Sequence, residues 1–160
     1  MFPGITIVVF IATLLFCETF IYFYHRYIGH ESRVLSASHS IHHKRGDLDQ
    51  GVEDLGWVLL LATVFFLMTI YARLFHLITY SPSLAICIGL ILSFAANWNI
   101  HRAYHVPGHW LYKYKWFRDL KDNHDQHHRY RRKNYGITNP LFDKIFGTYQ
   151  PTEPMLQKKI

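Results

Sequence analysis

The chain has 160 residues, half of them hydrophobic, and its 17 Lys and Arg against 11 Asp and Glu give a formal net charge of +6. This length predicts a single domain, residues 1–160. Because the hydrophobic residues are bunched into long runs, the positive charge is weak support for nucleic-acid binding, and we expect no nucleic-acid partner. Both cysteines, Cys17 and Cys87, fall inside those runs, which argues against a disulfide framework.

Three apolar runs are long enough to cross a bilayer, for which about 20 residues suffice. They are Phe2–Tyr24, about Leu55–Ile78 and about Pro82–Ile100. The first lacks the basic start of a signal peptide and leads straight into a histidine cluster, so we interpret it as a retained transmembrane helix. The sequence therefore predicts an all-α integral membrane protein with about three transmembrane helices.

The distribution of charge predicts the orientation of these helices. With three crossings, only Arg73 of the seventeen Lys and Arg residues lies near the face that holds the N-terminus. The other sixteen lie on the opposite face, which the positive-inside rule makes cytoplasmic. We therefore expect a multi-pass protein with a cytoplasmic C-terminus, in the endoplasmic reticulum of a eukaryote or the inner membrane of a bacterium.

Ten of the twelve histidines form four clusters, all on the predicted cytoplasmic face. These are HRYIGH (His25, His30), HSIHH (His39, His42, His43), HRAYH (His101, His105) and HDQHH (His124, His127, His128). Each half of the chain contains an apolar helix, a histidine pair and an HxxHH triplet. Neutral imidazole is the commonest protein ligand for transition metals, so the clusters predict a metal site capped by cytoplasmic or interfacial helices.

Helical spacing suggests how the clusters point. In HxxHH, all three side chains are expected within one narrow arc of a helix, as are His101 and His105. His25 and His30 are five apart, so we expect the helix to end or deform near Gly29, or His30 to extend from a less regular segment. Ten ligands suit two ions with about five imidazoles each, which leaves coordination positions open.

The ligand types restrict the metal. The clusters contain no cysteine, which disfavours soft-metal and iron–sulfur sites. The sequence has no HExxH motif and no Glu-x-x-His pair, which argues against a zinc protease and a carboxylate-bridged di-iron bundle. Imidazole suits both iron and zinc. A metal-binding or transport protein and a haem-binding electron carrier remain as rivals, although transporters usually bind near the midplane and haem needs only two ligands.

Several polar residues outside the clusters have two interpretations. Glu18 lies seven residues before His25, and it either supports a ligand or packs against Asn97 or Asn99. Asp125 either orients an imidazole or faces solvent. We expect His109, beside a Pro-Gly turn, and His76, on the opposite face, to bind no metal. The aromatic and basic stretch Trp110–Lys133 predicts an interfacial anchor or a docking surface for an acidic electron-transfer partner.

The four histidine clusters, in this order, resemble the histidine boxes of the membrane fatty acid hydroxylase/sterol desaturase superfamily. The segment NYGITNPLFDKIFGTY, residues Asn134–Tyr149, resembles the stretch that closes the catalytic region there, so the resemblance spans roughly His25 to Tyr149. The short chain and the HxxxxH first cluster are similar to the carotene hydroxylase branch, whereas the closing segment is more similar to the fatty acid and sterol branches.

The resemblance implies a non-haem di-iron oxygenase that hydroxylates an unactivated C–H bond of a membrane lipid with O2 and two electrons. It implies two iron ions, with zinc compatible in a purified sample, and no catalytic residue beyond the metal ligands His25, His30, His39, His42, His43, His101, His105, His124, His127 and His128. Carotenoid ring hydroxylation and desaturation are the alternatives. Because no cytochrome b5-like domain is fused, we expect an external cytochrome b5-like or ferredoxin-like donor; a homo-oligomer is compatible with the sequence.

Overall fold

The computed structural model describes residues 3–32, 36–45 and 51–151, and within these ranges the chain contains helices and no strands. The helices are α1 (Pro3–Phe23), the π-helix η1 (Tyr24–Glu31), α2 (Ser36–Arg45), α3 (Gly51–Leu74), α4 (Tyr80–Tyr104), the 3₁₀ helix η3 (Trp110–Lys113), α5 (Lys115–Arg129) and α6 (Leu141–Ile145). The predicted all-α fold is therefore confirmed. Residues 152–160, which include the C-terminus predicted to be cytoplasmic, lie outside the described residues.

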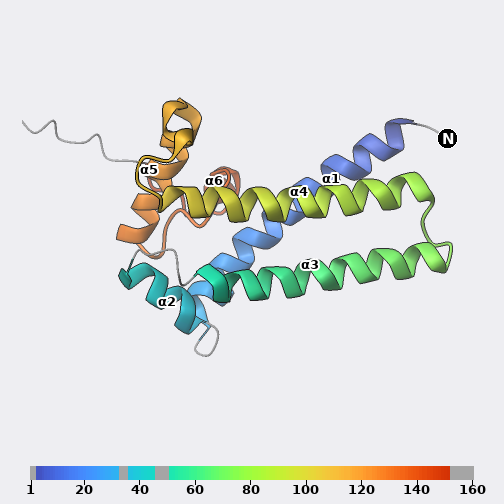
Figure 1. Ribbon diagram of the computed structural model, residues 1–160, viewed down its shortest axis with the longest axis horizontal. Coiled ribbons are helices and arrows are strands. Elements are labelled where there is room, and N and C mark those ends of the chain that lie inside the picture. The colour runs from blue at the N-terminus through green and yellow to red at the C-terminus, as the bar shows by residue number, and fades with distance from the viewer. Residues whose placement is uncertain (1–2, 33–35, 46–50, 152–160) are drawn as a thin grey trace, which may run out of the picture.

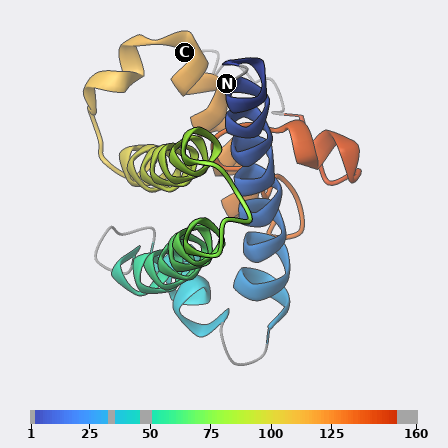
Figure 2. The same cartoon turned by 90° about the vertical axis from the view of Figure 1, so that its right-hand side faces the viewer.

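The three long helices α1, α3 and α4 form the elongated part of the molecule, hereafter called the shaft (Figure 1). Helices α3 and α4 run antiparallel and side by side, and α1 packs across α4 (Figures 1 and 2). Two of the described helical segments, Gly4–Glu31 and Tyr80–Tyr104, are long and apolar enough to cross a membrane, and Ala62–Leu74 forms a shorter apolar helix. The structure thus identifies two candidate spans where the sequence predicts about three.

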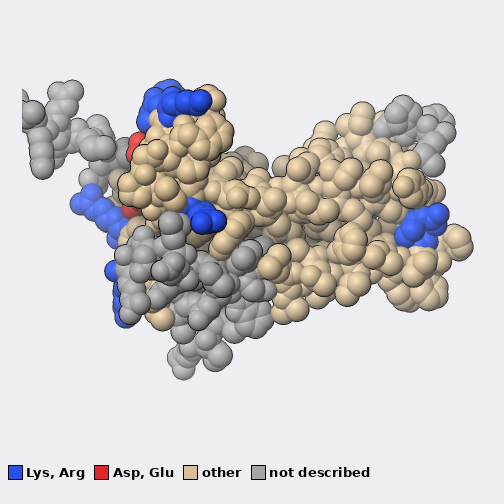
Figure 3. Space-filling view, viewed as in Figure 1, with Lys and Arg blue, Asp and Glu red and all other residues tan. Residues whose placement is uncertain are grey.

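The surface of the shaft is apolar. Large hydrophobic side chains on α1, α3 and α4 face outward, among them Val8, Leu67, Met68 and Ile91. Figure 3 shows most of the Lys and Arg surface at the end that holds α5 and a further blue patch at the opposite end, with an uncharged surface between them. Exposed apolar surface of this extent needs an apolar surrounding, which a bilayer provides.

Two apolar clusters hold the helices in place. In the shaft, Cys17 and Ile21 of α1 pack against Leu90 and Phe94 of α4. At the charged end, Tyr104 of α4 packs against Phe117 of α5 and Ile137, and its hydroxyl donates a hydrogen bond of 2.8 Å to the Ile137 carbonyl. The second cluster fixes the last turn of α4 against α5, and it thereby positions the histidines of both helices.

Candidate metal centre

All four histidine clusters meet at one end of the molecule (Figure 1). The first pair lies on η1 and the first triplet on α2. In the second pair, His101 lies on the last turn of α4 and His105 directly follows that helix, while the second triplet lies on α5. N-terminal and C-terminal halves of the chain therefore contribute to a single region. Within it the ten side chains form two groups of five, in each of which one ligand atom per residue lies within 4.8 Å of the others.

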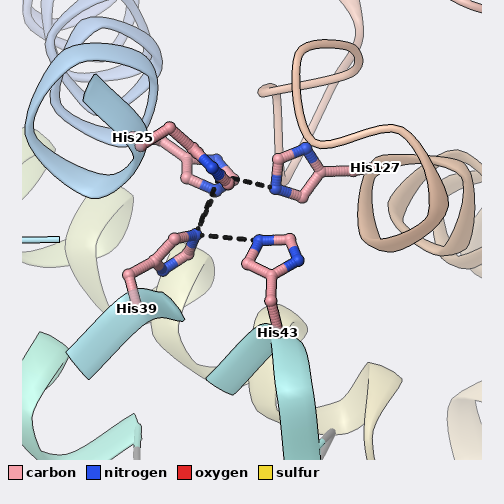
Figure 4. Close-up of side chains that lie close together, drawn as sticks. His25, His39, His43 and His127 are labelled. Carbon is pink, nitrogen blue, oxygen red and sulfur yellow. Dashed lines mark hydrogen bonds between the residues drawn. The ribbon is translucent and has the colours of Figure 1, made fainter. Parts of the chain in front are cut away.

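The first group, hereafter group one, surrounds His39. Its Nε2 atom lies 2.9 Å from Nε2 of His25 and 3.1 Å from Nε2 of both His30 and His43. The fifth member, His127, brings its Nε2 to 3.1 Å from that of His30. Figure 4 shows rings from η1, α2 and α5 turned toward one another. Two neighbouring segments, η1 and α2, and the distant helix α5 thus direct the same kind of nitrogen at a common point.

The second group, hereafter group two, surrounds His124 and contains His42, His101, His105, His124 and His128. Nε2 of His124 lies 3.0 Å from Nε2 of both His105 and His128. The His42 ring centroid lies 4.6 Å from that of His105. Group two adjoins group one, because the rings of His43 and His128 are only 4.3 Å apart between centroids.

The two groups have a crossed composition. Four members of each group come from one half of the chain: both histidines of its pair and the first and last histidines of its triplet. The fifth member is the middle histidine of the triplet in the other half. His42 therefore joins the group built mainly by the C-terminal half, and His127 joins the group built mainly by the N-terminal half. The prediction that each triplet points into one arc is wrong. Because an α-helix turns by about 100° per residue, the middle and last histidines of a triplet project to opposite sides of the first. One helix can therefore contribute side chains to both groups.

The π-helix explains the irregular spacing of the first pair. Hydrogen bonds from residue i to i+5 widen each turn, so residues five apart lie on one face. His25 and His30 accordingly lie 5.2 Å apart between ring centroids and both belong to group one. One of the predicted alternatives was a deformation of the helix near Gly29. The helix does deform, but the π-helical segment extends over all of Tyr24–Glu31. Gly29 leaves room for this: a Cβ there would lie 3.3 Å from Cδ2 of His39.

The donor set fits a metal ion in each group. Nε2 of His39 is within hydrogen-bond distance of three other Nε2 atoms, although an imidazole nitrogen carries at most one hydrogen. Nε2 of His101 is buried and has no hydrogen-bond partner among the described residues. Two nitrogens bound at a right angle about 2.1 Å from one ion are about 3 Å apart, which matches the observed separations. A cation would satisfy lone pairs that otherwise face one another.

Two backbone carbonyls fix the orientation of ligands in group one. Nδ1 of His25 lies 2.6 Å from the carbonyl oxygen of Tyr135, and Nδ1 of His127 lies 2.7 Å from that of Lys133. A carbonyl only accepts, so each Nδ1 donates its hydrogen and each Nε2 presents a lone pair to the group. This is the tautomer that binds metal, and such outer contacts typically hold metal-binding histidines in place.

Asp143 in turn holds the backbone that carries these carbonyls. Its side chain is fully buried and accepts hydrogen bonds of 2.7 Å from the Tyr135 and Gly136 amides and from the Thr148 hydroxyl. Burial raises the pKa of the Asp143 carboxyl, and these hydrogen bonds offset part of the rise. A Cβ at Gly136 would lie 2.1 Å from the Asn139 carbonyl oxygen, so this tight loop requires glycine. The closing motif was recognised from the sequence, but the role of Asp143 within it was not predicted.

Burial keeps the cluster imidazoles neutral. Desolvation, followed by repulsion from neighbouring imidazoles, lowers the pKa of His39, His43 and His124 well below the usual value of 6.5, and it lowers the pKa of His128 to about 3. Neutral imidazole is the form that binds metal. The folded chain therefore keeps these side chains ready for an ion at physiological pH.

The remaining polar residues lie outside both groups. The Glu18 carboxylate accepts hydrogen bonds of 2.6 Å from Thr138 and Asn139. It therefore packs against polar groups, as one interpretation had it, but these belong to the closing segment, which folds back onto α1, and they are not Asn97 or Asn99. Asp125 pairs with Lys121 at the surface. Nδ1 of His109 accepts a hydrogen bond from the Leu111 amide, and His76 is exposed in the turn between α3 and α4.

Comparison with known proteins identifies one family. The family model described as fatty acid hydroxylase matches residues 10–148, which include all ten clustered histidines and most of the closing segment. No curated protein and no solved structure matches the chain.

Proposed function

The chain belongs to the fatty acid hydroxylase family, and on that premise we propose that it is an O2-dependent, non-haem di-iron enzyme that hydroxylates an unactivated C–H bond of a membrane lipid. The observation that carries the proposal is the pair of adjoining five-histidine groups. In the overall reaction, a lipid C–H bond, O2, two electrons and two protons give the alcohol and water.

The residues proposed to hold iron are the five members of each group. Bound iron would supply the activation of O2 and the oxidation of the C–H bond, which amino-acid side chains cannot perform. Five imidazoles in each group would hold an ion and leave it able to take a further ligand. The chain contributes carbonyls that fix the tautomers of His25 and His127, and an apolar cavity wall on one side of the two groups.

We propose that α1 with η1, α3 and α4 each cross the bilayer and that the histidine groups lie at the cytoplasmic side. The antiparallel packing of α3 on α4 supports the third crossing, because two helices of 24 and 25 residues then span the same thickness. Arg73 lies near the end of α3 that is remote from the histidines. The host membrane would be the endoplasmic reticulum in a eukaryote or the inner membrane in a bacterium.

A basic cleft supports an external electron donor with an acidic surface. The cleft has a volume of about 960 Å³ and is lined by Arg26, Arg131, Arg132 and Lys133, together with His30 and His43 of group one. Complementary charge speeds and orients association between proteins. A cytochrome b5-like or ferredoxin-like protein docked here would deliver its electrons next to group one.

The test is metal analysis of the purified full chain combined with lipid analysis of a host with and without it. We expect about two irons per chain and a lipid species that is heavier by one oxygen when the chain is present. A desaturated lipid or a hydroxylated carotenoid ring would reassign the reaction within the family. Bound zinc without any oxidised lipid would instead indicate a metal-binding or transport protein.

A further inference from the structure

A small apolar cavity lies directly against both histidine groups. It has a volume of about 60 Å³ and lies between α1, η1 and α4. Histidines of both groups contribute to its wall, namely His25, His39 and His101. Most of the remaining wall is aromatic or aliphatic, with Phe20, Phe94 and Trp98 among its members. A molecule in this cavity would touch the predicted ligands from the membrane side.

One amide interrupts this apolar lining. Asn97 is 8 % exposed and lines the cavity, and its Nδ2 atom has no hydrogen-bond partner among the described residues. It precedes His101 by four residues on α4, so the two side chains share a helix face. A buried hydrogen-bond donor without an acceptor is unfavourable, so such groups are rare in native proteins, and each one calls for an explanation such as a functional role. A substrate that brings an acceptor would satisfy it.

We propose that Nδ2 of Asn97 donates a hydrogen bond to an oxygen atom of the lipid substrate, adjacent to the carbon that is oxidised. The inference rests on the proposed function, because it takes the histidines of the cavity wall as metal ligands. The substrate is then an unbranched alkyl chain that carries a carbonyl or hydroxyl oxygen. A water molecule needs about 10–15 Å³, so 60 Å³ accommodates a short stretch of alkyl chain.

The shaft offers such a chain a way in from the bilayer. An apolar groove of about 490 Å³ lies between α3 and α4, and Phe94 and Trp98 line both the groove and the cavity. The two hollows therefore share a wall of two aromatic side chains. The body of an alkyl chain would lie in the groove, and its oxygen-bearing segment would pass this wall to reach Asn97.

The test compares Asn97→Leu with the matched control Asn99→Leu. Asn99 lies on the same helix and lines the groove but not the cavity, and its Nδ2 already donates to the Ala95 carbonyl at 2.7 Å. Its replacement should therefore change the binding of dodecane and of the ketones alike. The probes are dodecane and its positional series of ketones, which differ from it only by one acceptor oxygen. Binding to the full chain in lipid nanodiscs is measured as displacement of a bromododecane that quenches Trp98, with Trp98→Phe as the blank.

We expect the wild-type chain and Asn99→Leu to bind the best ketone about three- to tenfold more tightly than dodecane, the worth of one net hydrogen bond. Asn97→Leu should bind both equally, with unchanged metal content, and Asn97→Ala provides the same test if the leucine disturbs folding. A preference that survives in both Asn97 variants, or its absence in the wild type, would overturn the inference. Because the assay needs no turnover, a chain that shows the preference yet oxidises no lipid would instead contradict the proposed function.

Discussion

Nδ1 of His25 lies 2.6 Å from the carbonyl oxygen of Tyr135, although the two residues are 110 positions apart. Asp143 holds that carbonyl in place by accepting hydrogen bonds from the Tyr135 amide and from the Gly136 amide, which belongs to the same peptide unit as the Tyr135 carbonyl. The closing segment of the chain therefore controls how a histidine at the other end presents its Nε2 atom. A mutation far from the histidines in sequence should accordingly affect the metal.

Asp143→Asn should weaken both the fold and group one. An amide has one acceptor oxygen, so one of the Tyr135 and Gly136 amides loses its buried partner, at a cost of about 2–3 kcal/mol in the free energy of unfolding. Denaturant unfolding and metal analysis measure the two effects. Asp119→Asn is the control, because Asp119 forms an exposed ion pair with Lys115, and such pairs contribute about 0–1 kcal/mol. Equal stability of the two variants would exclude the proposed role of Asp143.

His42→Ala and His127→Ala should each remove an ion, but from different groups. His42 belongs to group two and His127 to group one. We expect either substitution to lower the iron content toward one per chain and to reduce lipid oxidation by at least about 100-fold, beyond the 10–100-fold that outer contacts typically contribute. His109→Ala should leave both quantities unchanged. Full activity in either ligand variant would remove that residue from the site.

Gly29→Ala should impair group one through packing alone. The added methyl group would lie 3.3 Å from Cδ2 of His39 and 3.4 Å from Cδ2 of His25, and neither ring can retreat without moving its Nε2. We expect a loss of iron affinity of about tenfold, comparable with the loss of an outer contact. Gly4→Ala is the matched control, because nothing lies within 4 Å of a Cβ there. Identical metal titrations of the two variants would contradict this account of the π-helix.

The metal-free protein should lose stability in acid below about pH 6.5. The folded state keeps His39 and His124 neutral, and it keeps His128 neutral down to a pKa of about 3, whereas the unfolded chain takes up protons near 6.5. Between these values the unfolded state binds more protons, so the free energy of unfolding falls as the pH falls. Melting temperatures of the chelator-treated chain should be flat above about pH 7.5 and decline toward pH 4. A flat profile over the whole range would show that the imidazoles are not buried.

The sequence analysis and the structure agree where the signal is local. The four clusters, the all-α fold and the family follow from residues that are close in sequence or arranged in a specific order. The crossed grouping of His42 and His127 does not, because it depends on which side chains of other helices each histidine meets, and spacing within one helix does not contain that information. The partners of Glu18 were missed for the same reason: Thr138 and Asn139 approach it only after the chain has folded.

The first pair shows a different limit. A spacing of five is unfavourable for a regular helix, and the sequence signalled a distortion at His25 and His30. Sequence spacing alone could not distinguish a helix end from a π-helix, because both relieve the mismatch. Asp143 carried no distinct signal, because it precedes Lys144 in a mixed polar and apolar segment and its partners are backbone amides that no side-chain pattern reveals.

The most direct test of the central claim is incorporation of labelled oxygen. The purified full chain, loaded with ferrous iron in nanodiscs of total host lipid, is supplied with ¹⁸O2 and a chemical reductant, and the lipids are analysed by mass spectrometry. We predict a lipid product that carries one labelled oxygen atom and is absent from the His42→Ala and His127→Ala variants. Unlabelled lipids from a chain that contains two irons would contradict the proposed oxygenase.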